Sequence, residues 1–315
     1  MNVIVHGGAG STPEEPEERQ AVLDGAARAG TEADSAVGAV QEAIRVLEDS
    51  PRFNAGVGGA VQSDGIVRTD AGIMTDRREA GAACSMPGVR RAVDVARAVM
   101  EETPHVLLSG VHAVDFAADH GIGVEEDLWS TRTRERWANL EPPAGGPREQ
   151  LAWIEDRFGE TADDPEGREL ESDPKDHDDA GHDPAGHGPK DHDTVGAVAS
   201  DGEHVAAATS TGGRWLALAG RVGDVPQIGS GFYCTPAGGA SATGAGEDIA
   251  RVTLSRLAVD HLEAGASAQE AADRAIDEFA AITDSTAGII VCDRKGGMGS
   301  AYNSELMQTK ALATN

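Results

Sequence analysis

The stretch His192-Asp193-Thr194-Val195-Gly196-Ala197-Val198-Ala199 marks an abrupt change from polar to apolar sequence. The apolar run that begins at Thr194 predicts a buried strand. The preceding residues 171–193 read ESDPKDHDDAGHDPAGHGPKDHD and contain no Val, Ile, Leu, Met, Phe, Trp or Tyr. Such a segment buries too little apolar surface to offset its ordering entropy. We therefore expect residues 161–193 to form a disordered linker.

The linker separates residues 1–160 from residues 194–315. In the first part, the hydrophobic spacing predicts helices over 13–29, 33–47, 92–101 and 106–119, with strands over 3–5 and 60–70. In the second part, it predicts a hairpin of 194–199 and 205–209, helices over 247–263 and 267–283, and two closing strands over 287–293 and 299–303. Helices and strands occur in blocks, which argues against the βαβ alternation of a Rossmann-like sheet.

The charge balance excludes one class of partner. Asp and Glu number 54 and Lys and Arg 26, so the net charge is −28. No basic cluster is present to pair with phosphates, so we expect binding neither to nucleic acid nor to anionic membranes. No run approaches the roughly 18 apolar residues of a membrane span. Only four of the basic residues are lysines, and many carboxylates with few lysines indicate a halophilic protein, whose self-repulsion is screened by salt.

Cysteine usage points to a compartment. Cys84, Cys234 and Cys292 are odd in number and far apart in sequence, which argues against a disulfide framework or a zinc ribbon. The first residues lack the basic region and the long apolar run of a signal peptide. We therefore expect a cytoplasmic protein.

The linker offers one candidate for metal binding. It contains four histidines among its aspartates, at His177, His182, His187 and His192. Side chains of these types could bind Ni²⁺ or Cu²⁺ weakly. A segment without a fold cannot preorganise such ligands, so a solvated acidic tether is the simpler interpretation. A non-enzymatic, metal-buffering acidic protein is nevertheless kept as a second hypothesis.

Two glycine-rich segments invite ligand-binding interpretations. The segment Gly244-Ala245-Gly246-Glu247-Asp248 lacks the lysine of a P-loop and carries two carboxylates where a phosphate would bind, so we interpret it as an acidic helix start. Arg221 and Asp224 lie three residues apart in a glycine-rich loop. They suit the α-carboxylate and α-amine of an amino acid, but an internal ion pair is the simpler interpretation of these two residues by themselves.

Thr194 is a candidate nucleophile. If the Asp193–Thr194 bond were cut, the new α-amine, with an unperturbed pKa of about 7.7–8.0, would be a built-in base for the threonine hydroxyl. A linker that can leave the site after cleavage is what this chemistry requires. On composition alone, a plain junction between a loop and a strand is the simpler interpretation.

Six short motifs occur in order along the chain. They are His6-Gly7-Gly8-Ala9-Gly10, Phe53-Asn54-Ala55-Gly56-Val57-Gly58, His192 to Ala199, Ala208-Thr209-Ser210-Thr211-Gly212-Gly213, Gly220-Arg221-Val222-Gly223-Asp224 and Ala242-Thr243-Gly244-Ala245-Gly246-Glu247. With these motifs the chain resembles the plant-type L-asparaginase/isoaspartyl peptidase family of the N-terminal nucleophile hydrolases. The resemblance covers nearly the whole chain except the linker, and six motifs in family order are far more specific than any one alone.

The resemblance implies a role for each matching position. Thr194 is similar to the nucleophile, which self-cleavage of the Asp193–Thr194 bond would create. Thr211 is similar to the second threonine, which bonds the nucleophile, and Asn54 to the residue that orients its amino group. The remaining implied roles are an oxyanion hole and a substrate clamp, formed by Thr243 with the amide of Gly244, and by Arg221 and Asp224 with the carbonyl of Gly246.

The resemblance also implies an α+β fold, the four-layer αββα sandwich, in which residues 1–160 and 194–315 are the α-subunit and β-subunit parts of one domain. The implied substrates are L-asparagine and β-aspartyl dipeptides, without a catalytic cofactor, and the implied assembly is (αβ)₂. A structural sodium ion is implied at the backbone carbonyls of Leu47, Glu48, Ser50, Phe53, Ala55 and Val57. The related glycosylasparaginases share the Asp-Thr and Thr-Gly pairs, and Gly212 favours the asparaginase branch over them.

Overall fold

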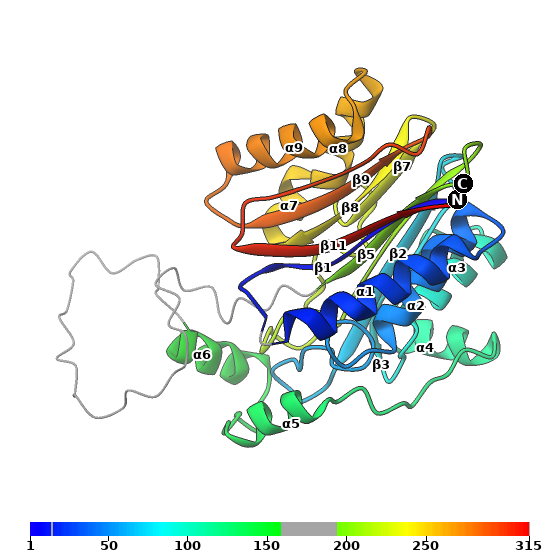
Figure 1. Cartoon of the computed structure of the whole chain (residues 1–315). Coiled ribbons are helices and arrows are strands. Elements are labelled where there is room, and N and C mark those ends of the chain that lie inside the picture. Colours follow the sequence, from blue (N-terminus) through cyan, green and yellow to red (C-terminus); the bar gives the residue numbers. More distant parts are fainter. Residues whose placement is uncertain (14, 159–193, 315) are drawn as a thin grey trace.

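The computed structural model describes residues 1–13, 15–158 and 194–314 (Figure 1). The predicted linker 161–193, with its four histidines and Asp193, lies outside the described residues. The two described parts of the chain, before and after residues 159–193, share one sheet. The first strand of the chain is hydrogen-bonded to two strands of the second part.

The fold has four layers, as the resemblance implies. The strands are β1 (Asn2–Gly10), β2 (Arg68–Thr75), β3 (Ala80–Pro87), β4 (Leu107–Ser109), β5 (Val195–Ser200), β6 (Val205–Thr211), β7 (Phe232–Thr235), β8 (Gly238–Gly244), β9 (Ala287–Asp293), β10 (Met298–Tyr302) and β11 (Leu306–Ala313). They form a seven-stranded sheet in the order β11-β1-β5-β6-β2-β3-β4 and a four-stranded sheet in the order β10-β9-β8-β7. The two sheets stack face to face between two layers of helices, which makes an αββα sandwich (Figure 1).

The helices of the outer layers pack on both sides of this pair of sheets. Those packed on the large sheet are α1 (Pro16–Thr31), α2 (Ala36–Glu48), α3 (Ala92–Glu102) and α4 (Gly110–Asp119). Those on the small sheet are α7 (Gly246–Val252), α8 (Leu254–Glu263) and α9 (Ala268–Ile282). Two further helices, α5 (Thr131–Ala138) and α6 (Pro147–Phe158), lie beside a separate cluster that contains the four tryptophans.

Strand alternation decides which residues enter which layer. In β5, Val195 and Ala197 face the helices, whereas Val198 faces the small sheet. Because successive side chains point to opposite faces of a strand, Thr194 points toward the small sheet. The same alternation in β6 turns Thr209 and Thr211 toward the small sheet and Ser210 toward α2. The sequence pattern therefore sends the threonines into the space between the sheets.

Several predicted elements differ from the structure. The helix predicted over 106–119 begins only at Gly110, because residues 107–109 form β4, which pairs in parallel with β3. The helix predicted over 247–263 is broken into α7 and α8 at Thr253, whose φ of 55° lies in the left-handed region. Of the strand predicted over 60–70, residues 60–67 form only a single bridge between Val61 and Val67, and the regular strand β2 begins at Arg68.

Some elements were not predicted at all. Strands β3 and β8 consist mostly of Gly, Ala and Ser, which lack the branched and aromatic side chains by which strands are recognised. Strand β11 follows the two strands that we expected to close the chain, and it pairs with β1. Among the described residues, no helix is both long and apolar enough to cross a membrane.

Candidate active site

Thr194 lies directly before β5, in the middle of the large sheet, and only 8% of its surface is exposed. Val195 pairs with Ser210 across the antiparallel β5–β6 ladder, which places Thr194 opposite Thr211. Thr211 in turn pairs with Asp70 of β2. Directly paired residues point to the same face of a sheet, so Thr194, Thr211 and Asp70 form a row at the end of the space between the two sheets.

The hydroxyl of Thr194 is held by a short chain of hydrogen bonds. It donates to Oγ1 of Thr211 over 3.1 Å, and the hydroxyl of Thr211 donates to the carbonyl oxygen of Asn54 over 3.4 Å. The backbone amide of Gly213 donates to the same Thr211 oxygen over 3.2 Å. The Thr211 hydroxyl is therefore fixed on three sides, and it fixes the rotamer of Thr194.

Asn54 builds the wall beside these two hydroxyls. Its side-chain amide donates to the carbonyl of Gly213 over 2.6 Å, and its side-chain oxygen accepts from the amide of Ala60 over 2.7 Å. Asn54 contacts the threonine pair through its backbone carbonyl, which accepts from Thr211. The predicted contact of its side chain with an amino group of Thr194 refers to the cleaved enzyme and stays a prediction.

The second sheet contributes Thr243 and Gly244 at the end of β8. Ala240 and Ala242 pack into the core under α8 and α9, so alternation turns Thr243 toward the large sheet, where it is fully buried. Gly244 has a φ of 137°, a conformation that other residues rarely adopt, and it lines the cavity beside Thr194. Of the two residues of the predicted oxyanion hole, Gly244 thus lines the cavity with Thr194, whereas Thr243 is not among the lining residues.

A cavity of about 260 Å³ opens in front of Thr194. Most of the predicted catalytic and substrate-binding residues line this cavity: Asn54, Thr194, Thr211, Arg221, Asp224, Gly244 and Gly246. Glu247, Asp248, Arg214 and Arg251 also line it. Sequence reasoning gave no role to Arg214 and Arg251, and it interpreted Glu247 and Asp248 only as an acidic helix start.

The far end of the cavity is shaped by Gly246. A Cβ atom at this position would lie 2.8 Å from Nη2 of Arg221 and 2.8 Å from Oδ1 of Asp224. Any side chain here would fill the space between a guanidinium and a carboxylate. The open space at Gly246 therefore matches the charged head of an amino acid, whose carboxylate and ammonium need these two partners.

The two alternatives left open for Arg221 and Asp224 can now be compared. No ion pair joins them directly in the described structure, and Arg221 pairs instead with Glu247. Asp224 is 5% exposed, and its Oδ2 has no hydrogen-bond partner among the described residues. Burial raises the pKa of Asp224 to about 7, against the opposing effect of Arg221. A buried carboxylate oxygen without a partner costs free energy, and an arriving ammonium group would satisfy it.

Asp70 is a second buried carboxylate that sequence reasoning missed. Its Oδ1 accepts the backbone amide of Ser85 over 2.6 Å. Burial raises the pKa of Asp70 to about 7, and the Ser85 amide and the charge of Arg221 oppose that rise. Asp70 thus adds negative potential behind Thr211 and helps to keep Arg221 charged.

His6 ties the two sheets together beneath the site. Burial lowers its pKa to about 3, so the ring is neutral. Gly8 donates to Nδ1, so Nε2 carries the proton and donates to Ser241 of the small sheet over 3.1 Å. Ser241 is 2.6 Å from the hydroxyl of Thr209, which donates to the carbonyl of Gly231. Every member of the chain has a partner, which favours a rigid site.

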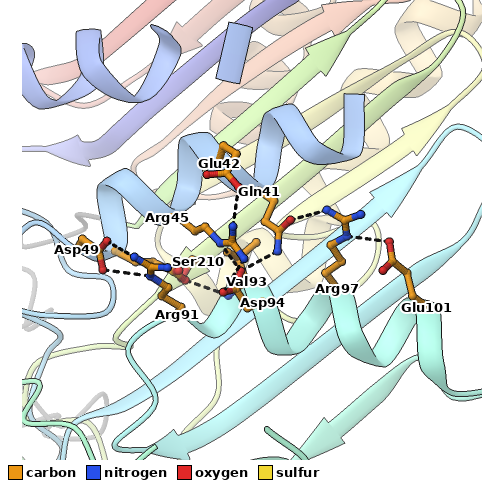
Figure 2. A network of polar contacts seen from close by, with 11 residues as sticks. Gln41, Glu42, Arg45, Asp49, Arg91, Val93, Asp94, Arg97, Glu101 and Ser210 are labelled. Atoms are coloured by element: carbon orange, nitrogen blue, oxygen red, sulfur yellow. Dashed lines mark hydrogen bonds and ion pairs between the residues drawn. The ribbon is translucent and has the colours of Figure 1, made fainter. Parts of the chain in front are cut away.

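Glu48 braces β6 from the helix side. It is fully buried, and its Oε1 accepts the Ser210 hydroxyl over 2.6 Å and the Val93 amide over 3.0 Å. Burial raises its pKa to about 8. Figure 2 shows, beside Ser210 and Val93, a network between α2 and α3 in which Asp94 accepts from Arg45 and from Gln41. The network holds the two helices against the strand that ends in Thr211.

Comparison with known proteins adds independent information. The model of one family, described as Asparaginase, matches residues 1–315. A plant-type L-asparaginase from Pyrococcus abyssi is 41% identical over 313 residues, which cover 97% of this chain and 94% of that relative. A second, from Pyrococcus furiosus, is 38% identical over 314 residues, with the same coverage of both chains. An isoaspartyl peptidase/L-asparaginase from Danio rerio is 35% identical over 320 residues, 98% of this chain and 91% of that protein.

Proposed function

The chain belongs to the asparaginase family and is an amidohydrolase, and we propose that Thr194 is the nucleophile with which it hydrolyses L-asparagine and β-aspartyl dipeptides. The observation that carries this proposal is the hydrogen bond of 3.1 Å between Thr194 and Thr211 at the wall of a cavity that also holds Arg221 and Asp224. A hydroxyl oriented by a second group, beside a space that matches the substrate, is the arrangement that nucleophilic catalysis requires.

We propose that the active enzyme is produced by self-cleavage. Oγ1 of Thr194 attacks the carbonyl carbon of Asp193, and the peptide C–N bond breaks as the acyl group moves from nitrogen to oxygen. Water then hydrolyses this ester, which leaves a carboxylate on Asp193 and a free α-amine on Thr194. The amine becomes the base for the second reaction because it is part of the same residue as the nucleophile.

In the second reaction, Oγ1 of Thr194 attacks the side-chain carbonyl of asparagine, and its α-amine accepts the hydroxyl proton. The negative oxygen of the tetrahedral intermediate would be stabilised by Thr243 and the amide of Gly244, donors of a kind that contribute a few kcal/mol each. The proton passes to the leaving nitrogen, and ammonia departs. Water hydrolyses the β-aspartyl ester, which releases aspartate and restores Thr194.

The same head group explains both substrate classes. Arg221 would hold the α-carboxylate, and Asp224, with the carbonyl of Gly246, would hold the α-ammonium. These groups are identical in L-asparagine and in a β-aspartyl dipeptide, which differ only beyond the scissile bond. Side-by-side kinetics on L-asparagine and β-Asp-Leu measure the preference.

The two alternative hypotheses receive less support. The quoted relatives are named asparaginase and isoaspartyl peptidase, which favours this branch over a glycosylasparaginase-like amidase. Membership of an enzyme family favours a hydrolase over a metal-buffering protein, and the linker histidines lie outside the described residues.

The proposed maturation predicts two chains in the active preparation, residues 1–193 and 194–315. By its share of the residues, the smaller chain accounts for about 12–13 kDa of the 32.5 kDa. Denaturing electrophoresis separates the chains, and Edman sequencing of the small band should begin Thr-Val-Gly-Ala-Val. A single full-length band in a preparation that hydrolyses asparagine would refute self-processing.

We propose a structural sodium ion at the carbonyls of Leu47, Glu48, Ser50, Phe53, Ala55 and Val57. A Cβ atom on Gly58 would lie 2.8 Å from the carbonyl oxygen of Pro51 and 3.0 Å from that of Phe53, so two carbonyls of this loop converge. Oxygen-rich surroundings of this kind suit a hard cation. The ion would stabilise the loop that carries Asn54.

We also propose an (αβ)₂ assembly in the cytoplasm. The assembly is inferred from the family resemblance. The three cysteines are buried and free, which fits a reducing compartment.

The halophilic composition leads to a prediction about salt. We expect the melting temperature and the turnover to rise between 0.1 and 3 M KCl, because a net charge of −28 destabilises the compact state. Salt shortens the Debye length from about 10 Å at 0.1 M to about 3 Å at 1 M. NaCl is kept at one low concentration throughout, so that occupancy of the proposed sodium site does not vary. Equal melting temperatures and rates across the series would refute the halophilic interpretation.

A further inference from the structure

The guanidinium of Arg221 is already partly occupied. Glu247, in the first turn of α7, accepts from Nε and from Nη2 of Arg221, each over 2.8 Å. The Arg221 side chain is 18% exposed and that of Glu247 is 47% exposed. A carboxylate that takes Nε and Nη2 together binds the side of the guanidinium and not its end.

The end of the guanidinium stays available for substrate. Of its five N–H donors, the two on Nη1 and the second one on Nη2 have no acceptor in the part of the chain that the structure describes. Nη1 and Nη2 each lie 3.0 Å from the position of a Cβ on Gly223, and Nη2 lies 2.8 Å from that of a Cβ on Gly246. Because Cζ is nearly as close to that Cβ position on Gly223, at 3.1 Å, Gly223 lies over the face of the guanidinium. Nη2 borders the space at Gly246, beside Oδ1 of Asp224, where the substrate head would bind.

Without Glu247, Arg221 would have another partner within reach. Oδ1 of Asp224 and Nη2 of Arg221 both lie 2.8 Å from the same point at Gly246, and Oδ2 of Asp224 has no hydrogen-bond partner among the described residues. A direct ion pair between Arg221 and Asp224 would neutralise both groups. The α-carboxylate and α-ammonium of a substrate would then have to break that ion pair before binding.

We propose that Glu247 is a positioning residue for substrate binding, which holds Arg221 from the side so that its free end receives the substrate α-carboxylate while Asp224 stays open for the α-ammonium. This inference rests on the proposed function of the cavity. Glu247 acts through Arg221 and touches no reacting atom. Its loss should weaken binding of the substrate head and leave the chemical step intact.

Asp248 provides a matched control. It is the next residue in the same helical turn and also a carboxylate, but it pairs with Arg251 over 2.7 Å and accepts from Ser285 over 2.5 Å. Glu247→Gln and Asp248→Asn each remove one negative charge at the same edge of the cavity. Only the first change removes the ion pair with Arg221.

The test is steady-state kinetics of the mature variants on L-asparagine. Positioning by Glu247 predicts that E247Q raises KM about tenfold or more while kcat stays within about threefold. D248N should keep KM within about threefold of the parent. Glu247→Asp retains the charge but is one methylene shorter, so E247D should also raise KM, whereas a pure charge effect would leave its KM unchanged.

A double-mutant cycle shows whether Glu247 acts through Arg221. In the Arg221→Ala background, E247Q should produce no further rise in KM. An equal rise in both backgrounds, or a KM of E247Q at or below that of the parent, would overturn the inference. Processing to two chains serves as the folding control, since the cleaved peptide bond has no free α-carboxylate.

If the unmodified protein is inactive on L-asparagine, the proposed function fails and this inference fails with it. An active parent with an unaltered E247Q refutes the inference alone.

Discussion

Thr194→Ala is expected to yield a folded, uncleaved chain whose asparagine hydrolysis falls by at least about a thousandfold. The substitution removes the hydroxyl that would attack the Asp193 carbonyl and later the substrate amide. Folding should survive, because among the described residues the side chain of Thr194 makes a hydrogen bond only to Thr211. Thr194→Ser keeps a hydroxyl and should process and retain weak activity. Electrophoresis, a melting curve and ammonia release measure the three properties.

Two outcomes would contradict the expectation for Thr194→Ala. A Thr194→Ala protein that turns over asparagine at the parental rate would show that another group is the nucleophile. A chain that remains uncleaved but active would separate the two proposed reactions and leave Thr194 with a role in processing alone. Thr211→Val provides a comparison at the neighbouring hydroxyl, since it removes the acceptor that orients Thr194 while the nucleophile remains.

Arg221→Ala is expected to lower kcat/KM for L-asparagine about ten- to hundredfold, mainly through KM. Charged hydrogen bonds of this kind contribute about 1.5–3 kcal/mol, and each 1.4 kcal/mol corresponds to about one decade in rate. The change also leaves Glu247 without its cation, and the arginine holds the pKa of Glu247 at about 2 despite partial burial. An ionised Glu247 would then repel the substrate carboxylate.

Self-cleavage of the Arg221→Ala protein should proceed, because the peptide bond at Thr194 offers no free α-carboxylate for Arg221 to bind. Kinetics on the mature variant test the expected rise in KM, and electrophoresis of the fresh preparation tests whether self-cleavage proceeds. Blocked processing combined with an unaltered KM would place Arg221 in a purely structural ion pair with Glu247.

Local sequence was sufficient where a feature depends on neighbouring residues. The apolar run after Thr194 predicted β5, and the hairpin around residues 201–202 is confirmed by the pairing of β5 with β6. The loop position of Arg221 and Asp224 is confirmed as well, because both lie outside the helices and strands. The αββα sandwich was predicted only through the family resemblance, because spacing alone does not show how two sheets stack.

Local sequence failed where long-range contacts decide the conformation. Residues 107–109 look helical, but they form an edge strand because β3 offers them free backbone groups. Thr253 sits in the middle of an apolar helical pattern, yet the helix breaks there and restarts in a new direction. Strand β11 follows two predicted closing strands, and its partner is β1 at the other end of the chain.

The sequence by itself determined that Thr194 begins a buried strand after a polar segment, and that a threonine-rich strand follows it. It also determined the excess of carboxylates and the two charged residues of the glycine-rich loop. Only the tertiary structure decided that Arg221 pairs with Glu247, that Oδ2 of Asp224 has no hydrogen-bond partner among the described residues, and that Asp70, His6 and Glu48 surround the site. Which charged groups pair depends on which segments of the fold meet at one buried point, because a buried charged group without a partner carries a desolvation cost. No local spacing encodes that convergence.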